Sequence, residues 1–369
     1  MKKISIIGAG ISGLYLANLL QKRGNYNYKI FEKKSDIKIK QGYGIQLSPN
    51  GVRLLNKIGF NEIISNETYL PRNINFYDAK SCNLISKIDI TQFNDNESKY
   101  TLLKRSVLVD FLKKNIPKEN LIFNADIKNI SFKETIKIEL GNGNNEEAEY
   151  LAICDGVFSK TKKMAIPESE DVKFYNSIAL RGTLKNVKSE DISLYLGPNF
   201  HFVIYPVNKK KEYNFVSIIR KKKFDKIENI DTERIINEIS SETSYDLKNK
   251  IENTSIYPVY TSKNFKAPVN KNVYLAGDAL FALPPSFAQG ASQSIESSFE
   301  VFKEIDEETS NYYRDRKLKT KKIKFRSNFN QFAFHLSNPF AKFSRNICLK
   351  FLTKNKFFIQ NYLGNIYKS

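Results

Sequence analysis

The sequence predicts an α/β fold, in which a mostly antiparallel β-sheet domain is inserted into a domain with a parallel sheet and a helical segment ends the chain. Three observations lead to this prediction. A glycine-rich stretch near the N-terminus joins a strand-like run to a helix-like run. Strand-like segments alternate with turns from about residue 172 to 260. After Ser286 the pattern is helical and stays helical to Ser369.

The composition excludes several classes of protein. With 41% hydrophobic and 13% aromatic residues among 369, the chain has enough apolar material for a folded core. No run approaches the roughly 18 to 20 apolar residues that a membrane-spanning helix needs. Cys82, Cys154 and Cys348 are too few and too scattered for a disulfide framework or a zinc site, so no metal is expected. We expect a cytoplasmic protein.

The net charge of +20 does not by itself indicate a nucleic-acid partner. Lysines are spread along the chain, with short runs only at 209–211, 221–223 and 321–322. Lys, Asn and Ile are all abundant, as a compositionally biased genome would produce. No DNA- or RNA-binding motif accompanies the charge. We therefore expect no nucleic-acid partner, but we expect the charge to attract anionic ligands.

The first 32 residues predict a β-α-β unit. Lys3–Ile7 is a short apolar run typical of a strand, and Tyr28–Glu32 is a second one. Between them, Leu14–Arg23 has a helical pattern that Gly24 ends. A secretory signal peptide is rejected, because glycines interrupt the apolar stretch soon after Ile7.

These glycines form the motif Gly8-Ala9-Gly10-Ile11-Ser12-Gly13, which is placed where a dinucleotide-binding loop requires it. The motif follows a strand and begins a helix, so the N–H groups of the helix N-terminus would face a pyrophosphate. Glu32 lies 19 residues beyond Gly13, at the end of the second strand. A carboxylate there accepts hydrogen bonds from a ribose and favours FAD or NAD over a 2′-phosphorylated nucleotide.

Further elements follow in order along the chain. Ser48–Ile58 predicts a helix, because Ser48 is a good cap and proline follows it at the first helical position. Leu103–Ile116 is a second helix candidate. Ile136–Glu139 and Ala148–Ile153 predict a hairpin around a Gly/Asn turn.

The middle of the chain predicts the inserted domain. Its clearest strands are Ser177–Thr183, Phe200–Val207 and Glu212–Ile219, and they favour an antiparallel sheet. Asn272–Ala276 then has the pattern of a buried strand, which returns the chain to the first domain.

Two more strands run into a glycine and an aspartate. One carries Cys154-Asp155-Gly156, and the other carries Gly277-Asp278-Ala279. Such turns can bring a carboxylate or an amide up to a bound sugar or ring. Gly290-Ala291-Ser292 begins the next helix, whose free N–H groups would favour negative charge on a bound ring.

Taken in this order, the motifs resemble those of the single-component flavoprotein aromatic hydroxylases, which include para-hydroxybenzoate hydroxylase and salicylate hydroxylase. The resemblance covers nearly the whole chain. Further segments are similar to the salicylate hydroxylase branch: Gly42–Asn50, Leu196–Pro198, Tyr205–Val207 and Phe334–Leu336.

The resemblance implies a domain organisation and a cofactor. A Rossmann-like FAD-binding domain is expected over residues 1–70, 100–165 and 270–318, with a substrate domain over 71–99 and 166–269 and a helical C-terminal segment over 319–369. The residues that the resemblance assigns to FAD are Gly8, Gly10, Ser12, Gly13, Glu32, Lys33, Gln46, Arg105, Asp155, Asp278, Gly290, Ala291 and Ser292.

The resemblance also implies an activity. NADH or NADPH reduces FAD, O2 reacts to give a flavin C4a-hydroperoxide, and oxygen passes to a phenol or an aromatic carboxylate. The chain contains no second glycine motif for NAD(P)H, as is usual in this family. The catalytic candidates are His201 as base, Tyr205 to orient a substrate hydroxyl and Arg181 to hold an anionic substrate, while His335 is expected to be structural.

Three residues depart from the family pattern. Phe281 and Ile204 stand where histidines are frequent, and Lys162 stands where an arginine is usual. FAD binding tolerates these changes. The loss of polar groups leaves open a third function, an FAD-binding reductase or oxidase without oxygen transfer.

The C-terminal segment leaves open a second function, the hydroxylation of a polyprenylphenol quinone precursor at the inner membrane surface. Phe343, Ile347 and Phe351 share one helical face, and the basic residues nearby are Arg345, Lys350, Lys354 and Lys356. The favoured interpretation is a terminal helix packed on the FAD domain, with at most weak peripheral membrane contact. A flavin halogenase is excluded, because that family's motif contains tryptophan and this chain has none.

Overall fold

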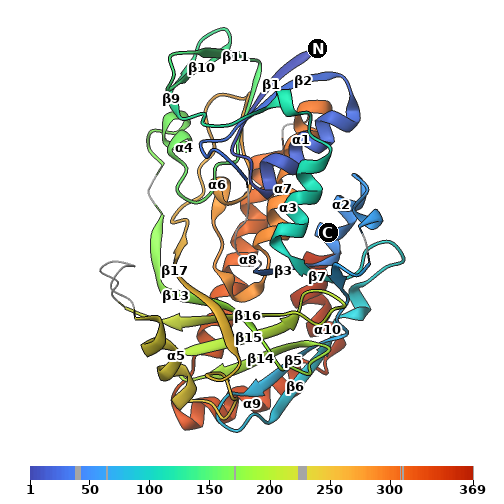
Figure 1. Ribbon diagram of the computed structural model, residues 1–369, viewed down its shortest axis with the longest axis vertical. Helices are drawn as coiled ribbons and strands as arrows, with labels where there is room; N and C mark the ends of the chain where they lie inside the picture. Colours follow the sequence, from blue (N-terminus) through green and yellow to red (C-terminus); the bar gives the residue numbers. More distant parts are fainter. Residues whose placement is uncertain are drawn as a thin grey trace.

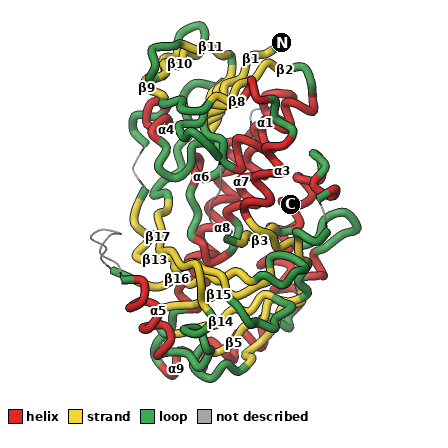
Figure 2. Tube along the Cα trace, viewed as in Figure 1, coloured by secondary structure: helices red, strands yellow, loops and turns green. Residues whose placement is uncertain are grey.

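The computed structural model describes residues 1–37, 43–63, 65–169, 172–222, 231–307, 309 and 311–368. Gly42 of the salicylate hydroxylase-like segment lies outside the described residues. A parallel sheet lies at one end of the molecule and a seven-stranded sheet at the other (Figure 1). Figure 2 shows the long helices α7 (Gly290–Glu307) and α8 (Tyr312–Phe334) between these two ends.

The parallel sheet has the strand order β18-β12-β1-β2-β8. β1 (Lys2–Ile7) lies in the centre and pairs with β2 (Tyr26–Phe31) and β12 (Tyr150–Ile153). β18 (Val273–Leu275) and β8 (Leu121–Ile122) form the edges. Helix α1 (Ile11–Arg23) contacts β1 and β2, and β11 (Asn145–Ala148) of a small antiparallel sheet also contacts β1.

The helices of this domain pack on the sheet and on one another. α1 (Ile11–Arg23) begins within the glycine motif and is capped by Gly24. The φ of Gly24 is 78°, a left-handed conformation that favours a residue without a side chain. α1 packs on α7 and on α3 (Arg105–Lys114), and α2 (Pro49–Asn56) also packs on α7. Leu14, Leu16 and Ile30 are fully buried in the core that results.

The seven-stranded sheet has the order β17-β13-β16-β15-β14-β5-β6. All neighbouring strands are antiparallel except β14 and β5, which are parallel. The bounds are β5 Asn73–Asp78, β6 Leu84–Asp89, β13 Lys173–Leu184, β14 Ile192–Gly197, β15 Phe200–Pro206, β16 Tyr213–Arg220 and β17 Ile251–Thr261. The predicted fold class, a nucleotide-binding α/β domain with a mostly antiparallel sheet inserted, is confirmed.

Short elements complete the two halves. Two three-stranded sheets contain β3 Gly44–Leu47, β4 Thr68–Tyr69 and β7 Thr101–Lys104, and β9 Ile127–Phe132, β10 Ile136–Leu140 and β11 Asn145–Ala148. The short helices are α4 Lys160–Ala165, α5 Thr232–Ser241 and α6 Asp278–Phe281, with 3₁₀ turns at Phe60–Glu62, Thr91–Phe93, Lys118–Asn120 and Pro285–Phe287.

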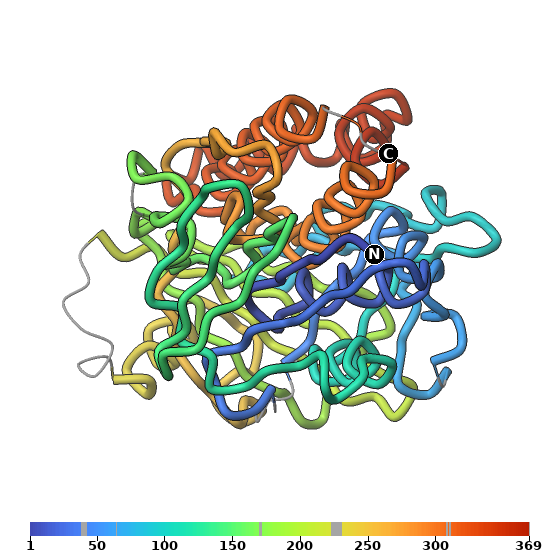
Figure 3. The backbone as a smooth tube through the Cα atoms, turned by 90° about the horizontal axis from the view of Figure 1, so that it is seen from above, coloured from blue at the N-terminus to red at the C-terminus, as the bar shows by residue number. Residues whose placement is uncertain are grey.

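The C-terminal segment is helical throughout, as predicted. It contains α8, α9 (Pro339–Leu352), α10 (Lys356–Ile359), a π-helical turn at Gln360–Gly364 and α11 (Asn365–Tyr367). Viewed from above, this orange-to-red segment lies along one side of the molecule (Figure 3). Over the described ranges, no helix combines the length and the apolar character that a membrane span requires.

The predicted helix at Leu103–Ile116 is confirmed as α3, but it begins at Arg105 because Thr101–Lys104 pairs as β7 with β3. Two other local predictions are wrong. The predicted hairpin ends at Ala148, since Tyr150–Ile153 turns away and pairs in parallel with β1. The terminal helix α9 does not pack mainly on the FAD domain, because it lies on β6 of the seven-stranded sheet, whereas α8 contacts α7 and α11 contacts α2.

Candidate active site

The glycine motif forms a tight loop between β1 and α1. Gly8 has a φ of 98°, and a Cβ atom there would lie 2.6 Å from the carbonyl oxygen of Cys154. A Cβ on Gly13 would lie 2.0 Å from the carbonyl oxygen of Gly8. Both glycines are therefore required by the close approach of α1 and β12 to the loop.

Gly10 has a different environment. A Cβ at Gly10 would meet no atom within 4 Å, so the space above this residue is open to a ligand. Glu32, at the end of β2, stands beside the loop: its Oε2 accepts a hydrogen bond from the Ala9 N–H at 2.9 Å, and its Oε1 accepts one from Lys34 at 3.0 Å. Lys33 follows it and is exposed. This arrangement leaves the N-terminus of α1 facing a place for a pyrophosphate.

The two Asp-Gly motifs meet at the same edge of the parallel sheet, because β12 and β18 are neighbours. Asp155 follows β12; its Oδ2 accepts a hydrogen bond from Thr161 at 2.8 Å, while its Oδ1 is buried and has no partner among the described residues. Gly277 brings Asp278 close to the first motif, since a Cβ there would lie 2.3 Å from Ser12 Oγ. Lys162 donates to the carbonyl oxygen of Leu280 at 3.3 Å and so joins the two motifs.

Arg105 stands near Asp278, and Arg181 in turn stands near Arg105. Burial and the charge of Arg181 lower the pKa of Arg105, at the start of α3, while Asp278 raises it. Burial raises the pKa of the Asp278 carboxyl, and the positive charge of Arg105 opposes this shift. Arg181 lies with its guanidinium carbon 5.9 Å from the ring centres of Tyr43 and Tyr257, and its Nε is buried without a partner among the described residues. The two guanidinium groups repel each other, so an anion beside them would be stabilised.

The N-terminus of α7 forms another side of the cleft. A Cβ on Gly290 would meet nothing within 4 Å, so this helix end is also open. The Ser292 side chain is used within the protein, because its Oγ accepts from the backbone N–H of Ser48 at 3.1 Å. The N–H groups of Gly290 and Ala291 are the ones available to a bound ring.

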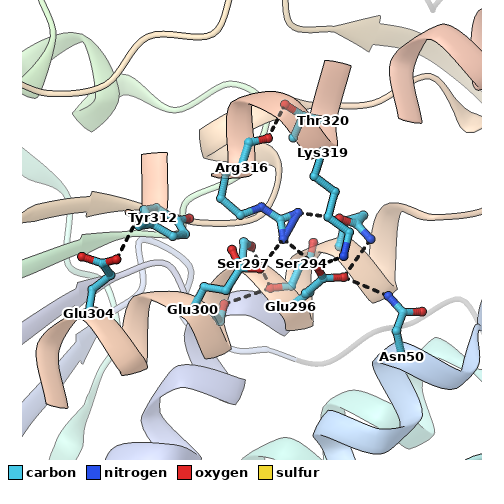
Figure 4. Close-up of polar contacts among 12 residues, drawn as sticks. Asn50, Ser294, Glu296, Ser297, Glu300, Glu304, Tyr312, Arg316, Lys319 and Thr320 are labelled. Carbon is cyan, nitrogen blue, oxygen red and sulfur yellow. Dashed lines mark hydrogen bonds and ion pairs between the residues drawn. The ribbon is translucent and has the colours of Figure 1, made fainter. Parts of the chain in front are cut away.

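A buried ion network holds α7 against α8 and α2 (Figure 4). Arg316, only 1% exposed, donates to Glu296 at 3.0 Å and to Glu300 at 3.1 Å. Asn50 donates to Glu296 at 2.9 Å, and Lys319 also pairs with Glu296. Because the charges are paired and hydrogen-bonded, burial is tolerated, and the network fixes the helix whose first residues face the cleft.

The two carboxylates of this network differ. The cations Arg316 and Lys319 outweigh burial at Glu296 and lower its pKa. At Glu300 burial outweighs the charge of Arg316 and raises the pKa to about 7. The Glu300 Oε2 is buried without a partner among the described residues, which explains why its charged form is disfavoured.

An apolar cavity of about 160 Å³ lies between the seven-stranded sheet and the C-terminal helices. Its end nearest the cleft is formed by Gln46 and by Pro285–Ala288, just before α7. None of the described residues that line it carries a charge. The remaining lining residues are Ile74, Phe76, Ile88, Tyr100, Ile192, Leu194, His201, Val203, Phe329, Asn330, Phe334, Leu349, Leu352, Thr353, Phe358, Ile359, Tyr362, Leu363 and Tyr367.

His201 lies in the wall of this cavity, on β15. It is 3% exposed, and its Nδ1 lies 2.8 Å from Nε2 of His335, at the end of α8. Burial lowers the pKa of His201 to about 3 and, together with His201, lowers that of His335 to about 2. Both rings are neutral at pH 7, so His201 can share a hydrogen bond with a ligand but is a weak base.

The other two catalytic candidates do not line the cavity. Tyr205 is 3% exposed and lies beside Gln46, whose hydrogen bond and the Arg181 charge only partly offset the burial that raises its pKa. Arg181 faces Tyr43, Tyr257 and Arg105, so it is on the side of the cofactor cleft. Because neither Tyr205 nor Arg181 lines the cavity, their predicted roles toward the substrate gain no support from it and stay predictions.

Some site residues were missed by the sequence analysis. The Tyr100 hydroxyl donates to Gln46 Oε1 at 2.8 Å, and the ring of Tyr367 lies 5.8 Å from that of Tyr100. Both line the cavity, as does Phe334, which precedes His335. The sequence contains no signal for these contacts, because the residues lie in segments far apart along the chain.

The two frequent family histidines that are replaced here do not concern this cavity. The ring centres of Phe281 and Phe265 lie 6.1 Å apart, and Lys324 Nζ lies 5.1 Å from the ring centre of Phe281. Ile204 lies on the opposite face of β15 from His201 and Val203, in the core that contains Phe202 and Phe215. Neither Phe281 nor Ile204 lines this cavity, but Phe281 lies with Gly277, Asp278 and Gly290 around a smaller pocket.

The residues of the cleft fit FAD. The open space above Gly10, the unpaired Asp155 Oδ1 and the unpaired Arg181 Nε are places where a phosphate, a hydroxyl and an anionic group respectively would find a partner. Gly8, Gly13, Glu32, Asp155 and Asp278 all gather at the ends of β1, β2, β12 and β18.

Comparisons with known proteins agree with this fit. A family model described as FAD binding domain matches residues 1–324. The FAD-dependent monooxygenase ntnA of Nectria sp is 25% identical over 97% of this chain, which spans about half (53%) of that relative. Two crystal structures share the fold: Klebsiella pneumoniae HpxO complexed with FAD, in a variant form (TM-score 0.86, 15% identity, 100% and 99% of the two chains), and a salicylate hydroxylase substrate complex (0.80, 17%, 100% and 97%).

The family match covers most of the chain, and it includes all three motifs of the cleft. The resemblance inferred from those motifs is confirmed. The chain belongs to the FAD binding domain family of flavoproteins.

Proposed function

We propose that the protein is an FAD-dependent monooxygenase that uses NADH or NADPH and O2 to hydroxylate a neutral aromatic compound, a phenol. The observation that carries this proposal is the uncharged cavity, whose lining includes Gln46 and the residues Pro285–Ala288 just before the N-terminus of α7. Residues 1–70, 100–165 and 270–318 form the cofactor domain in this proposal, and residues 71–99 and 166–269 form the substrate domain.

The cofactor would be held by the residues of the cleft. Gly8, Gly10, Ser12 and Gly13 with the N-terminus of α1 would bind its pyrophosphate, and Glu32 would bind its adenosine ribose. Asp155, Asp278 and Arg105 would bind its ribityl chain, and Gly290 and Ala291 would bind its ring. Bound FAD supplies electron transfer from NAD(P)H and the activation of O2, which side chains cannot supply.

The protein's own contribution is to orient the substrate and exclude water. Apolar side chains surround the ring, and Gln46, held by Tyr100, offers a hydrogen-bonding group at the cleft end. His201 offers a neutral imidazole on the sheet wall, to which a substrate hydroxyl can bond. Exclusion of water by these apolar side chains would suppress side reactions during oxygen transfer.

The uncharged wall selects among the substrates. An aromatic carboxylate would lose its hydration here without gaining a cationic partner, which is costly. A neutral phenol, including one with an apolar chain such as a polyprenylphenol, meets no such penalty. We therefore favour neutral phenols over the carboxylates that the family resemblance also allows, and we assign Arg181 to the cofactor side.

The test is a screen of NADH and NADPH oxidation with matched neutral and carboxylated phenols, with hydrogen peroxide measured in parallel. We expect neutral phenols to accelerate oxidation and to appear as hydroxylated products. Acceleration by carboxylates alone would contradict the neutral substrate class. If all electrons appear as peroxide with every compound, the protein is an FAD reductase or oxidase without oxygen transfer.

A further inference from the structure

Helix α8 presents a row of exposed aromatic side chains. Phe325, Phe329 and Phe332 are 72%, 49% and 61% exposed. Their spacing of four and then three residues puts them on one face of the helix. Lys321 and Lys322 precede Phe325 by one helical turn and are also exposed. A row of large apolar rings in water indicates a surface that binds something.

Helix α9 presents a second row of the same kind. Phe340, Phe343, Ile347 and Phe351 are 84%, 66%, 38% and 72% exposed, and they too share one helical face. The exposed Lys350 lies one turn beyond Ile347. We call the exposed apolar residues of these two rows, Phe325, Phe329, Phe332, Phe340, Phe343, Ile347 and Phe351, the aromatic face. Figure 3 shows the helices that carry it along the same side of the molecule.

The charge of this region is one-sided. From Arg316 to Ser369 the sequence contains thirteen Lys and Arg and no Asp or Glu, so thirteen of the net +20 charges belong to these 54 residues. Seven of the thirteen are exposed lysines: Lys317, Lys321, Lys322, Lys350, Lys354, Lys356 and Lys368. The excess of positive charge is therefore concentrated in the C-terminal helices. This differs from the even spread that the positions of the lysine runs suggested.

We propose that the aromatic face is a docking surface for an anionic lipid bilayer, in whose interface α8 and α9 lie without crossing it. Phenylalanine rings enter the boundary between headgroups and acyl chains, while lysines on long apolar stems reach anionic headgroups. Neither feature alone is sufficient: the rings supply burial, and the lysines supply the charge complementarity that favours phosphate-bearing lipids.

Two other partners fit the same features less well. A second copy of the chain would bring two surfaces of the same positive charge together in a two-fold contact, and they would repel. A nucleic acid would pair with the lysines but would leave most of these phenylalanines without an apolar partner. A bilayer satisfies both kinds of side chain.

The aromatic face also reaches the cavity, which gives the docking a purpose. Phe329 is half exposed on α8 and at the same time lines the cavity, together with Leu349 and Leu352 of α9 and Phe358 of α10. An apolar phenol dissolved in the bilayer would therefore enter between these helices without crossing water. This part of the inference rests on the proposed function.

The absence of tryptophan from the chain makes a direct test possible. In the FAD-loaded protein, Phe343→Trp places a single reporter on the aromatic face, and Leu70→Trp places one at a 49% exposed position outside it. With vesicles of phosphatidylglycerol and phosphatidylcholine that carry brominated acyl chains, we expect quenching at position 343 and none at position 70. No quenching at either position, or equal quenching at both, would overturn the proposal.

A sedimentation assay with the same vesicles tests the two forces separately. We expect Phe340→Ser/Phe343→Ser/Phe351→Ser to weaken binding at least about 100-fold and a rise from about 0.05 M to about 0.5 M salt to weaken it at least about tenfold. Leu70→Ser/Val269→Ser removes exposed apolar residues elsewhere and should bind as the wild type does. A triple variant that binds the vesicles as well as the wild type does would contradict the proposal. The proposal would also be contradicted if the wild type formed a dimer, or bound DNA, and the triple variant did not.

A last comparison separates this inference from the proposed function. With a long-chain phenol carried in vesicles, we expect the triple variant to raise the apparent KM at least about tenfold, and with a short water-soluble phenol we expect no change. If neither phenol accelerates NAD(P)H oxidation while vesicle binding persists, the proposed function fails and the docking surface stands. If the long-chain phenol is oxidised equally by both proteins, entry from the bilayer is wrong.

Discussion

His201 Nδ1 and His335 Nε2 lie 2.8 Å apart, so the only two histidines of the chain meet in the wall of the cavity. Each neutral ring has one N–H, and only one of the two rings can donate across this contact. The Nδ1 of His335 is buried without a partner among the described residues. The pair is therefore a neutral, hydrogen-bonded element of the core that presents one face of His201 to the cavity.

Acid should destabilise the protein through this pair. Burial lowers both pKa values, to about 3 and about 2, so the unfolded chain binds two protons below pH 6.5 that the folded chain does not. Stability is thus present above pH 6.5 and is lost as the pH falls. Glu300, whose pKa is raised to about 7, works in the opposite direction with one proton. Urea denaturation of His335→Gln should give a slope with pH that is lower by about 1.4 kcal/mol per pH unit between pH 6 and 5; an unchanged slope would show that His335 is solvated.

The substitution His201→Gln should lower the hydroxylation rate only modestly. A well-placed general base contributes about 10² to 10⁴ in rate, but a ring whose pKa is about 3 is too weak a base for that role. We expect a loss of less than about tenfold, with the pH dependence set by the phenol itself. A loss above about 10² with phenols, in a variant that binds FAD and NAD(P)H normally, would make His201 the base after all.

Gly10→Val should separate folding from cofactor binding. No atom lies within 4 Å of a Cβ there, and the φ of −80° suits any residue, so the stability of the protein without FAD should hardly change. The added side chain occupies the place of the pyrophosphate, and we expect FAD affinity to fall at least about 100-fold. Gly8→Val is the contrast, because its Cβ would meet backbone at 2.6 Å and should cost stability as well. Full FAD content in Gly10→Val would contradict the assignment of the loop.

Asp278→Asn should weaken FAD binding about tenfold, because it removes the carboxylate beside Arg105 and leaves the like charges of Arg105 and Arg181 less compensated. Flavin fluorescence titration and the reduction kinetics report this change. Asp126→Asn, at an exposed position that pairs with Lys128, is the control and should have no effect. Normal flavin content in Asp278→Asn would mean that Gly277-Asp278 is only a turn.

Arg316→Met should destabilise the protein by about 3–5 kcal/mol, since it leaves Glu300 buried beside Glu296 without its cation. Arg234→Met breaks an exposed pair with Glu238 and should cost about 0.5 kcal/mol or less. Urea denaturation measures both. Adding Glu300→Gln to Arg316→Met should restore part of the loss, and no recovery would show that the cost comes from packing alone.

The sequence predicted what depends on local spacing. The glycine loop, Glu32 at the end of the next strand and the two Asp-Gly turns are each defined by a short pattern, and the cleft they form matches the prediction. Tyr150–Ile153 shows the limit of such patterns. A short apolar run fits a hairpin as well as a buried parallel strand. Its partner strand β1 lies at the other end of the sequence of this domain, so a local pattern does not reveal the pairing.

The cavity could not be predicted, because it lies between elements brought together only by the fold. His201 and His335 are 134 positions apart, and Tyr100 meets Tyr367 from the last helix. The orientation of Ile204 was also not stated by the sequence pattern: alternation along β15 puts it on the opposite sheet face from His201, which lines the cavity.

The strand order β18-β12-β1-β2-β8 also sets when the cleft can exist during synthesis. A ribosome delivers β1 first, but both strands on one side of it, β12 and then β18, emerge much later. At about 5–20 residues per second, β1 and β2 wait more than roughly ten seconds for the edge that carries Asp278. One side of β1 has no neighbour until β12 emerges, and α1 has no α7 to pack on until still later. Cofactor capture is thus a late event in the biogenesis of this protein, and a nascent chain shorter than about residue 300 is exposed to misfolding and proteolysis without the protection that bound FAD would give.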